Sequence, residues 1–121
     1  MKLTSIAMAI AMILLSSCTY DTLEDSDLSP DDCLSREVSY TVDINPILEL
    51  SCSSCHNSGF NSGGVSLDSY EAVKDVADSG RLLGSIKHER GFSAMPRGAA
   101  QFDDCTISLF EDWITQGAPN N

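Results

Sequence analysis

Apolar and polar positions divide the chain into an apolar leader, a polar stretch and a region of helical periodicity. The leader, residues 6–15, is an unbroken apolar run of ten residues behind the basic Lys2. Such a run is shorter than the roughly 20 residues that span a bilayer, and it predicts a signal-peptide core. Residues 19–36 carry clustered acidic side chains among Ser, Thr and Pro, with too little apolar surface to form a core. We therefore expect a folded domain over residues 37–121.

Capping signals and apolar periodicity predict the first helices of this domain. Asn45 can cap a helix with Pro46 at its first position, and this helix leads into Cys52. A second helix is expected over residues 69–78, because its apolar side chains share one stripe, and Gly80 can end it. The stripe consists of Tyr70, Val73, Val76 and Ala77.

The second half of the domain continues this pattern. A short helix is predicted over residues 81–87, followed by a Gly-, Ala- and Pro-rich loop over residues 89–102. Asp103 or Asp104 can cap the last helix. Its apolar residues are Ile107, Phe110 and Ile114, with Leu109 and Trp113 beside them, and Gly117 and Pro119 stop it. The only strand candidate is residues 38–42, so the expected fold class is all-α.

Cys52, Cys55 and His56 form the sharpest motif of the chain, C-x-x-C-H, which is the pattern of covalent haem attachment. Two thiols at this spacing can reach the two vinyl groups on one edge of a porphyrin, and the neutral imidazole next to them can bind the iron. The motif predicts one haem c. The haem would also supply an apolar centre for a domain whose own core is thin. One alternative is a thioredoxin-like dithiol, which needs a βαβ context that the pattern lacks. The other is half of a zinc site, for which no second ligand pair has the right spacing.

Met95 is the candidate for the second axial ligand of the iron. The other three of the four Met residues lie in the leader. Met95 sits in a loop, and Pro96 after it stiffens that loop, so the sulfur can be held with a smaller loss of entropy. His88 is the rival ligand, and an open iron site is the third possibility.

The order of these features resembles the class I c-type cytochrome family. Residues 42–121 more closely resemble small monohaem lipoprotein cytochrome domains. The matching residues are Asn45-Pro46-Ile47-Leu48, Cys52 to His56, Met95-Pro96, and Trp113-Ile114 with Gly117-Ala118. The resemblance implies an all-α fold wrapped around one covalent haem, ligated by His56 and Met95, in which the first and last helices cross. Cys33 and Cys105 are not part of the family pattern.

Leu15-Ser16-Ser17-Cys18, at the end of the leader, resembles a bacterial lipobox. The resemblance implies a lipoprotein signal peptide over residues 1–17, a lipid on Cys18 and an acidic tether over residues 18–36. A plain signal peptide that happens to carry a Cys is the alternative. Thr19, rather than Asp, follows the Cys, which by resemblance to bacterial sorting rules favours the outer membrane. We expect a protein of the bacterial cell envelope, on a periplasmic or extracytoplasmic face.

The chain holds five cysteines. Lipid on Cys18 and haem on Cys52 and Cys55 leave Cys33 and Cys105. In an oxidising compartment these two are expected to form a disulfide. Two separately buried thiols, or an intermolecular bridge, are the alternatives.

The charge is strongly acidic, with 18 Asp+Glu against 7 Lys+Arg and a net charge of −11. Nucleic acid is therefore excluded as a partner, since phosphate binding needs basic surface. Lys87, Arg90 and Arg97 surround the Met95 loop and can face either haem propionates or solvent.

No catalytic constellation is visible, and an iron with both axial positions filled has no site for a substrate. The sequence therefore predicts an electron carrier rather than an enzyme, with redox proteins as partners. A haem protein with an open distal site, which binds a small ligand or acts like a peroxidase, is the alternative. A lipoprotein whose haem only stabilises the fold is a third possibility.

Overall fold

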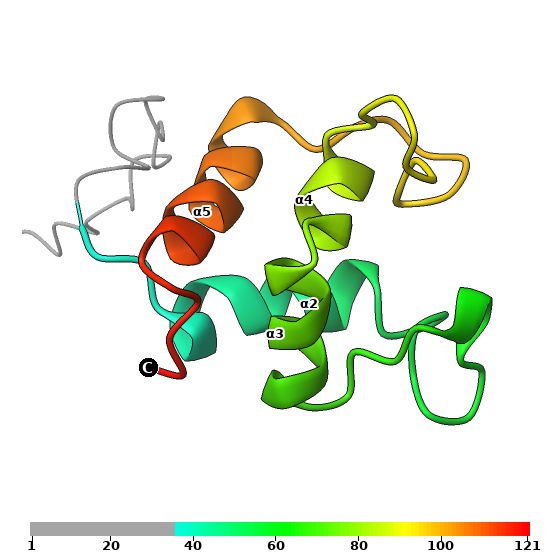
Figure 1. Ribbon diagram of the computed structural model, residues 1–121, viewed down its shortest axis with the longest axis horizontal. Helices are drawn as coiled ribbons and strands as arrows, with labels where there is room; N and C mark the ends of the chain where they lie inside the picture. The colour runs from blue at the N-terminus through cyan, green and yellow to red at the C-terminus, as the bar shows by residue number, and fades with distance from the viewer. Residues whose placement is uncertain (1–35) are drawn as a thin grey trace, which may run out of the picture.

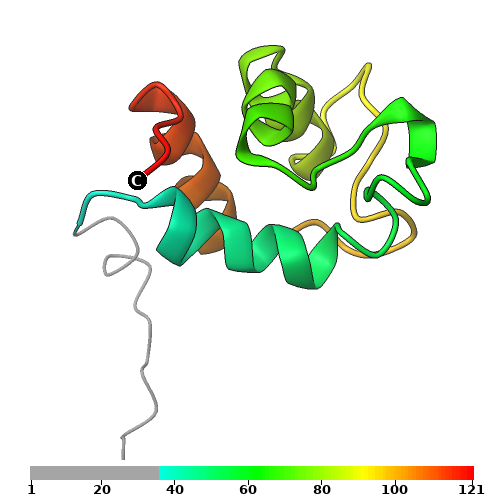
Figure 2. The same cartoon turned by 90° about the horizontal axis from the view of Figure 1, so that it is seen from below.

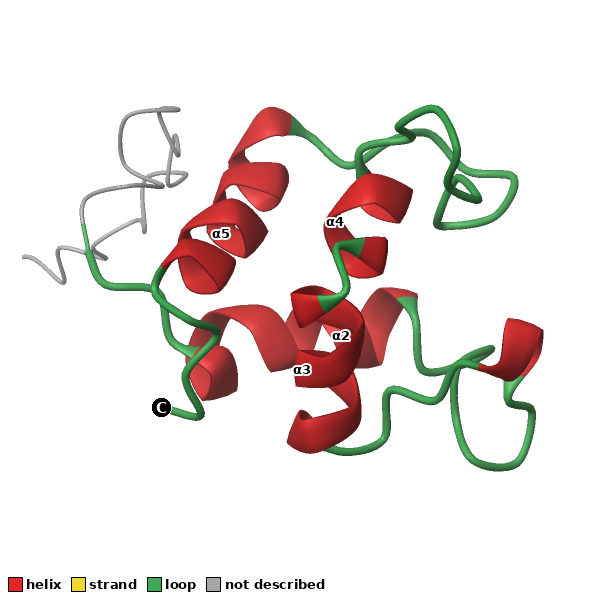
Figure 3. Ribbon diagram, viewed as in Figure 1, coloured by secondary structure: helices red, strands yellow, loops and turns green. Residues whose placement is uncertain are grey.

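The computed structural model describes residues 36–121, and this part consists of helices and loops (Figures 1 and 3). The helices are the π-helical turn η1 (Tyr40–Ile44), α2 (Asn45–Ser51), the 3-10 turn η2 (Ser62–Gly64), α3 (Tyr70–Asp78), α4 (Arg81–Ile86) and α5 (Asp104–Thr115). Residues 36–121 contain no strand, which confirms the all-α expectation. The predicted signal peptide and tether, with Cys18 and Cys33, lie outside the described residues. No helix within residues 36–121 is long and apolar enough to cross a membrane.

The strand candidate at residues 38–42 is wrong, because local hydrogen bonds turn this segment into η1. The hydroxyl of Ser39 accepts a hydrogen bond from the N–H of Val42, and the carboxylate of Asp43 accepts one from the N–H of Ser39. Tyr40 and Ile44, four positions apart, are both buried, as one face of a helix requires.

Side chains cap two of the helices, and the cap of α5 is one that the sequence predicts. Ser69 accepts a hydrogen bond from the N–H of Ala72 at the start of α3, and Asp103 accepts one from the N–H of Thr106 at the start of α5. Asn45 is not the N-cap that the sequence predicts: it is already helical, because η1 runs directly into α2. Its amide nitrogen instead donates to Oε1 of Glu49, 2.8 Å away.

The core lies where η1 packs against α5 (Figure 2). The largest fully buried side chains are Trp113, Phe110, Ile44, Leu48, Val38 and Val73. The ring of Tyr40 contacts the ring of Trp113, with centroids 5.5 Å apart, and that of Tyr70 at 5.1 Å. Trp113 and Tyr40 therefore form an aromatic cluster in this core, and the half-buried Tyr70 packs against it.

Asn121 joins the two ends of the described chain. Its backbone oxygen accepts a hydrogen bond of 3.0 Å from the N–H of Thr41, and its side-chain oxygen accepts one of 2.8 Å from the N–H of Tyr40. Both ends therefore lie together, while the loop after α2 and the loop after α4 lie at the opposite end of the molecule (Figures 1 and 2).

Candidate haem-attachment site

The C-x-x-C-H motif forms a compact turn at the end of α2. Cys52 is the C-cap of this helix, and its N–H donates to the carbonyl oxygen of Leu48 at 2.9 Å. The N–H groups of Cys55 and His56 both donate to the carbonyl oxygen of Cys52 at 3.0 Å. The turn therefore gathers the two thiols and the imidazole into one short stretch of backbone.

The ring of His56 is oriented by the main chain. Its Nδ1 lies 3.2 Å from the carbonyl oxygen of Val65. A carbonyl oxygen can only accept, so Nδ1 carries the hydrogen and Nε2 keeps its lone pair. The carbonyl oxygen of His56 in turn accepts a hydrogen bond of 2.7 Å from the N–H of Leu67. A backbone partner on one ring nitrogen, with the other nitrogen left basic, is the arrangement of metal-binding histidines.

Asn57 braces the loop that follows the motif. Its side-chain oxygen accepts hydrogen bonds from the N–H groups of Gly59 at 2.9 Å and Phe60 at 2.8 Å. Its amide nitrogen donates to the carbonyl oxygen of Ser53 at 2.7 Å. Asn57 was not among the predicted site residues. The available signal was the Asn two positions before a Gly, because Asn side chains hydrogen-bond to backbone N–H groups a few residues on.

Both cysteines of the motif are free thiols in the structure, Cys52 half-buried and Cys55 exposed. Burial raises the pKa of the Cys52 thiol. Reactive dithiols of the thioredoxin type depend on a lowered pKa, which keeps the attacking sulfur as thiolate. The environment of Cys52 therefore does not favour the dithiol alternative.

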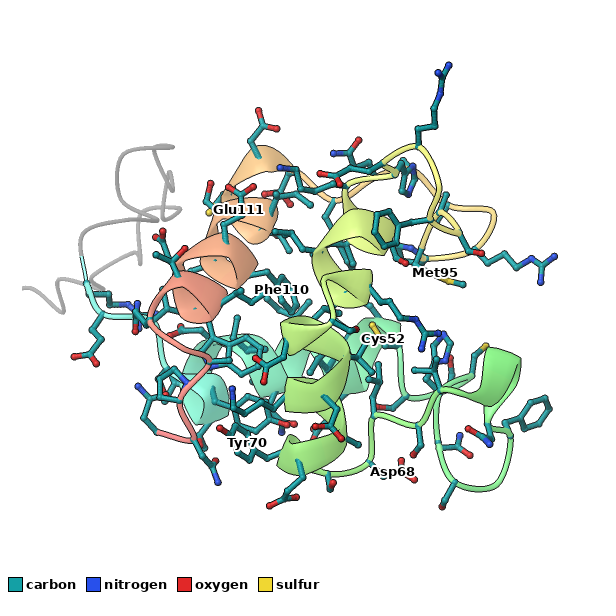
Figure 4. All side chains as sticks on the ribbon, viewed as in Figure 1. Cys52, Asp68, Tyr70, Met95, Phe110 and Glu111 are labelled. Carbon is teal, nitrogen blue, oxygen red and sulfur yellow. The ribbon has the colours of Figure 1, made fainter. Side chains whose placement is uncertain are left out.

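Met95 lies at the same end of the molecule as Cys52, in the loop after α4 (Figure 4). Its N–H donates to the carbonyl oxygen of Ser85 in α4 at 3.0 Å. Its side chain borders a hollow of about 300 Å³, together with Ser93, Ala94 and Arg97. Arg97 thus remains near the candidate ligand, where it can pair with a carboxylate.

Two other polar residues near Met95 already have partners. Nε2 of His88 lies 3.1 Å from the carbonyl oxygen of Met95, so that nitrogen carries a hydrogen and donates it to the main chain. Nζ of Lys87 lies 2.7 Å from Oε1 of Glu111 in α5, and this hydrogen bond raises the pKa of Lys87. The structure thus gives His88 a hydrogen bond to the Met95 carbonyl, and it directs Lys87 to α5.

The loops after α2 and after α4 are suited to pack against a large apolar group. No side chain in residues 49–66 or in residues 87–106 is buried. Leu50 and Phe60 are 88% and 77% exposed. Yet backbone hydrogen bonds fix both loops, as at His56 and Met95. Two ordered loops without a core of their own are consistent with a haem held between the Cys–His turn and the Met95 loop.

Cys105 lies half-buried in the first turn of α5 and is not a free thiol. Its predicted partner, Cys33, lies outside the described residues, so the pairing stays a prediction. Within residues 36–121, no group of three or more His, Cys, Asp and Glu side chains is placed to hold a metal ion. Residues 36–121 therefore provide no set of ligands for the zinc alternative.

No protein-family model matches the chain, and no curated protein or solved structure matches it either.

Proposed function

We propose that the chain is a monohaem c-type cytochrome that carries single electrons. The observation that carries this proposal is the turn in which Cys52, Cys55 and His56 come together while the Val65 carbonyl fixes the His56 ring. The hydrogen bond leaves Nε2 of His56 as a metal ligand, and the adjacent thiols provide covalent attachment.

Each residue then has a defined role. The Cys52 and Cys55 thiols would hold the haem covalently, as thioethers to its vinyl groups, in a domain too small to enclose it. His56 and Met95 would be the ligands of the iron, and an iron held by both would have no site for a substrate. When bound, the haem supplies Fe(III)/Fe(II) exchange, and thioether ligation raises its potential relative to two histidines.

The negative charge of the chain is consistent with brief encounters with basic redox partners, because complementary charge steers association. A lipid on Cys18 would keep these encounters at a membrane of the bacterial envelope, for which the outer membrane is favoured. Replacement of Cys18 by Ala tests this part of the proposal. Lipid labelling should disappear in that variant, and unchanged labelling would refute the anchor.

The proposed function is tested on the protein isolated from cells with a working haem-attachment system. The denatured chain should carry the mass of one haem, and the visible spectrum should change reversibly on oxidation and reduction. A double variant, Cys52→Ser with Cys55→Ser, is the matched control and should retain no covalent haem. An apoprotein mass for the unmodified chain would overturn the proposal. A bound haem that exchanges electrons only slowly would favour the structural role instead.

A further inference from the structure

Both backbone polar groups of Met95 are held by residues at or just beyond the end of α4. The N–H of Met95 donates to the carbonyl oxygen of Ser85 at 3.0 Å. The carbonyl oxygen of Met95 accepts the hydrogen of Nε2 of His88, 3.1 Å away. The first bond comes from the helix backbone, whereas the second depends on a single side chain. That side chain lies seven positions before the residue it holds.

The backbone at His88 has an unusual conformation. Its φ is 52°, in the left-handed region that residues other than Gly rarely adopt. The conformation closes the end of α4, where the N–H of His88 donates to the Ser85 carbonyl at 3.2 Å and the N–H of Glu89 donates to the Gly84 carbonyl at 2.9 Å. Asn or Gly would fit this turn with less strain, but neither offers a ring that reaches Met95.

The loop between His88 and Met95 also lies against the helix. Phe92 is the contact, because its ring occupies the space beside Gly84, where a Cβ would lie 2.5 Å from the ring. Residues 89–94 are all exposed, and Phe92 itself is 40% exposed. The loop is therefore fastened by the Phe92 ring and by the two hydrogen bonds of Met95, with little burial to support it.

We infer that His88 is a positioning residue for the Met95 thioether. Its Nε2–H holds the carbonyl of Met95 and so restrains the loop that carries the sulfur. This inference rests on the proposed function, in which Met95 binds the iron. A restrained ligand loses less conformational entropy on binding, so an external ligand displaces it less readily. His88 would act through Met95 and would not touch the iron.

Imidazole displacement on the ferric holoprotein measures this restraint. His88→Leu removes the donor, whereas His88→Gln keeps an N–H at a similar reach. We expect imidazole to bind His88→Leu about five-fold more tightly than the unmodified protein, which is the factor that one hydrogen bond contributes. His88→Gln should restore most of the original value. Gln101→Leu, at an exposed position in the same loop, is the control and should leave the affinity unchanged. If His88→Leu yields no holoprotein, His88→Gly takes its place, because Gly adopts a positive φ without strain.

A second readout does not depend on iron ligation. Amide hydrogen exchange at Met95 should accelerate in His88→Leu and remain slow in His88→Gln, because the loop opens more often without the ring. Equal imidazole affinity in all three proteins, with unchanged exchange at Met95, would overturn the inference. Absence of covalent haem in the unmodified protein would instead refute the proposed function, and Met95 exchange would still decide whether His88 holds the loop.

Discussion

The hydroxyl of Tyr70 donates a hydrogen bond of 2.7 Å to the carbonyl oxygen of Ala118. Ala118 is fully buried, so water cannot replace this donor in the folded state. Close by, Nε1 of Trp113 donates to the carbonyl oxygen of Pro119 at 2.9 Å. Two aromatic side chains thus fix the segment after α5 to the core.

Tyr70→Phe should therefore lower the free energy of unfolding. A buried carbonyl left without its donor costs about 1–3 kcal/mol, and the ring itself would still pack. Denaturant unfolding of the two proteins measures the difference. Phe60→Leu is the control, because Phe60 is 77% exposed and should change stability by less than about 0.5 kcal/mol. A Tyr70→Phe protein as stable as the original would show that the bond contributes nothing.

Gly84→Ala should disturb the Met95 loop although Ala is the better helix former. The new Cβ would lie 2.5 Å from the ring of Phe92, so the ring must leave its place. We expect unfolding at lower denaturant and easier displacement of Met95 by imidazole. The double variant Gly84→Ala with Phe92→Ala removes the clash and should be more stable than the Gly84→Ala protein. No difference between the single and double variants would contradict this account.

Met95→Ala should remove the long-wavelength band of methionine-ligated ferric haem and lower the reduction potential, because a thioether raises it. His88→Ala should keep the band, because in the proposed ligation His88 contacts the Met95 carbonyl and not the iron. Visible spectra and redox titration of both variants decide the assignment. A band that disappears only in His88→Ala would reverse it, and a band absent even from the unmodified protein would point to an open distal site.

Asp43 makes the stability of the domain depend on pH. Burial alone would raise the pKa of this carboxyl, but hydrogen bonds from the Arg36 guanidinium and the Ser39 N–H outweigh burial and hold the pKa below its usual value. A lowered folded-state pKa adds stability above the unfolded value, about 3.9, and that stability is lost as the pH falls through the folded pKa.

Asp43→Asn should therefore cost about 1–3 kcal/mol near neutral pH, and the difference should shrink once the pH falls below about 4. Denaturant unfolding over a series of pH values tests the trend. Asp75→Asn, at an exposed position in α3, is the control. A loss in Asp43→Asn that is equally large at low pH would contradict the electrostatic origin.

Cys105→Ser and Cys33→Ser should destabilise the domain equally if the two residues form the predicted disulfide. The bridge would close a loop of about 70 residues, for which the chain-entropy model gives roughly 4 kcal/mol. This is an upper value, because the haem link already restricts the unfolded chain. Peptide mapping without reduction should find one peptide that joins both positions. A free thiol at either position in protein from its own compartment would exclude the bridge.

Local signals in the sequence predicted most of the helices. Asp103 caps α5 as expected, because a cap needs only a side chain and the backbone three residues on. Ser69 was expected inside the second helix and is instead the cap of α3. Capping logic was wrong at Asn45, since the buried contacts of Tyr40 and Ile44 favour a helical turn before it. In α5 the fully buried stripe runs through Ile107, Phe110 and Trp113, and Ile114 is only half-buried.

The candidate site was less accessible from the sequence. The motif shows that His56 and the two thiols belong together, but not that the Val65 carbonyl orients the ring. Likewise, the composition of residues 89–102 predicts a loop, but it does not show that Met95 forms hydrogen bonds with Ser85 and His88. Both contacts depend on the path that the irregular backbone takes over several residues. No periodic pattern in the sequence predicts that path.

The junction between Asn121 and Tyr40 also bears on how a lipid anchor would hold the domain. The described chain begins beside Asn121, at the end of the molecule opposite Met95 (Figures 1 and 4). If the chain is anchored through Cys18 as proposed, the tether would join the domain at the end away from the proposed haem. The haem end would then stay open to donors and acceptors that approach from the aqueous side. A fusion after Asn121 would emerge beside the point where the tether joins the domain and would leave the haem end clear.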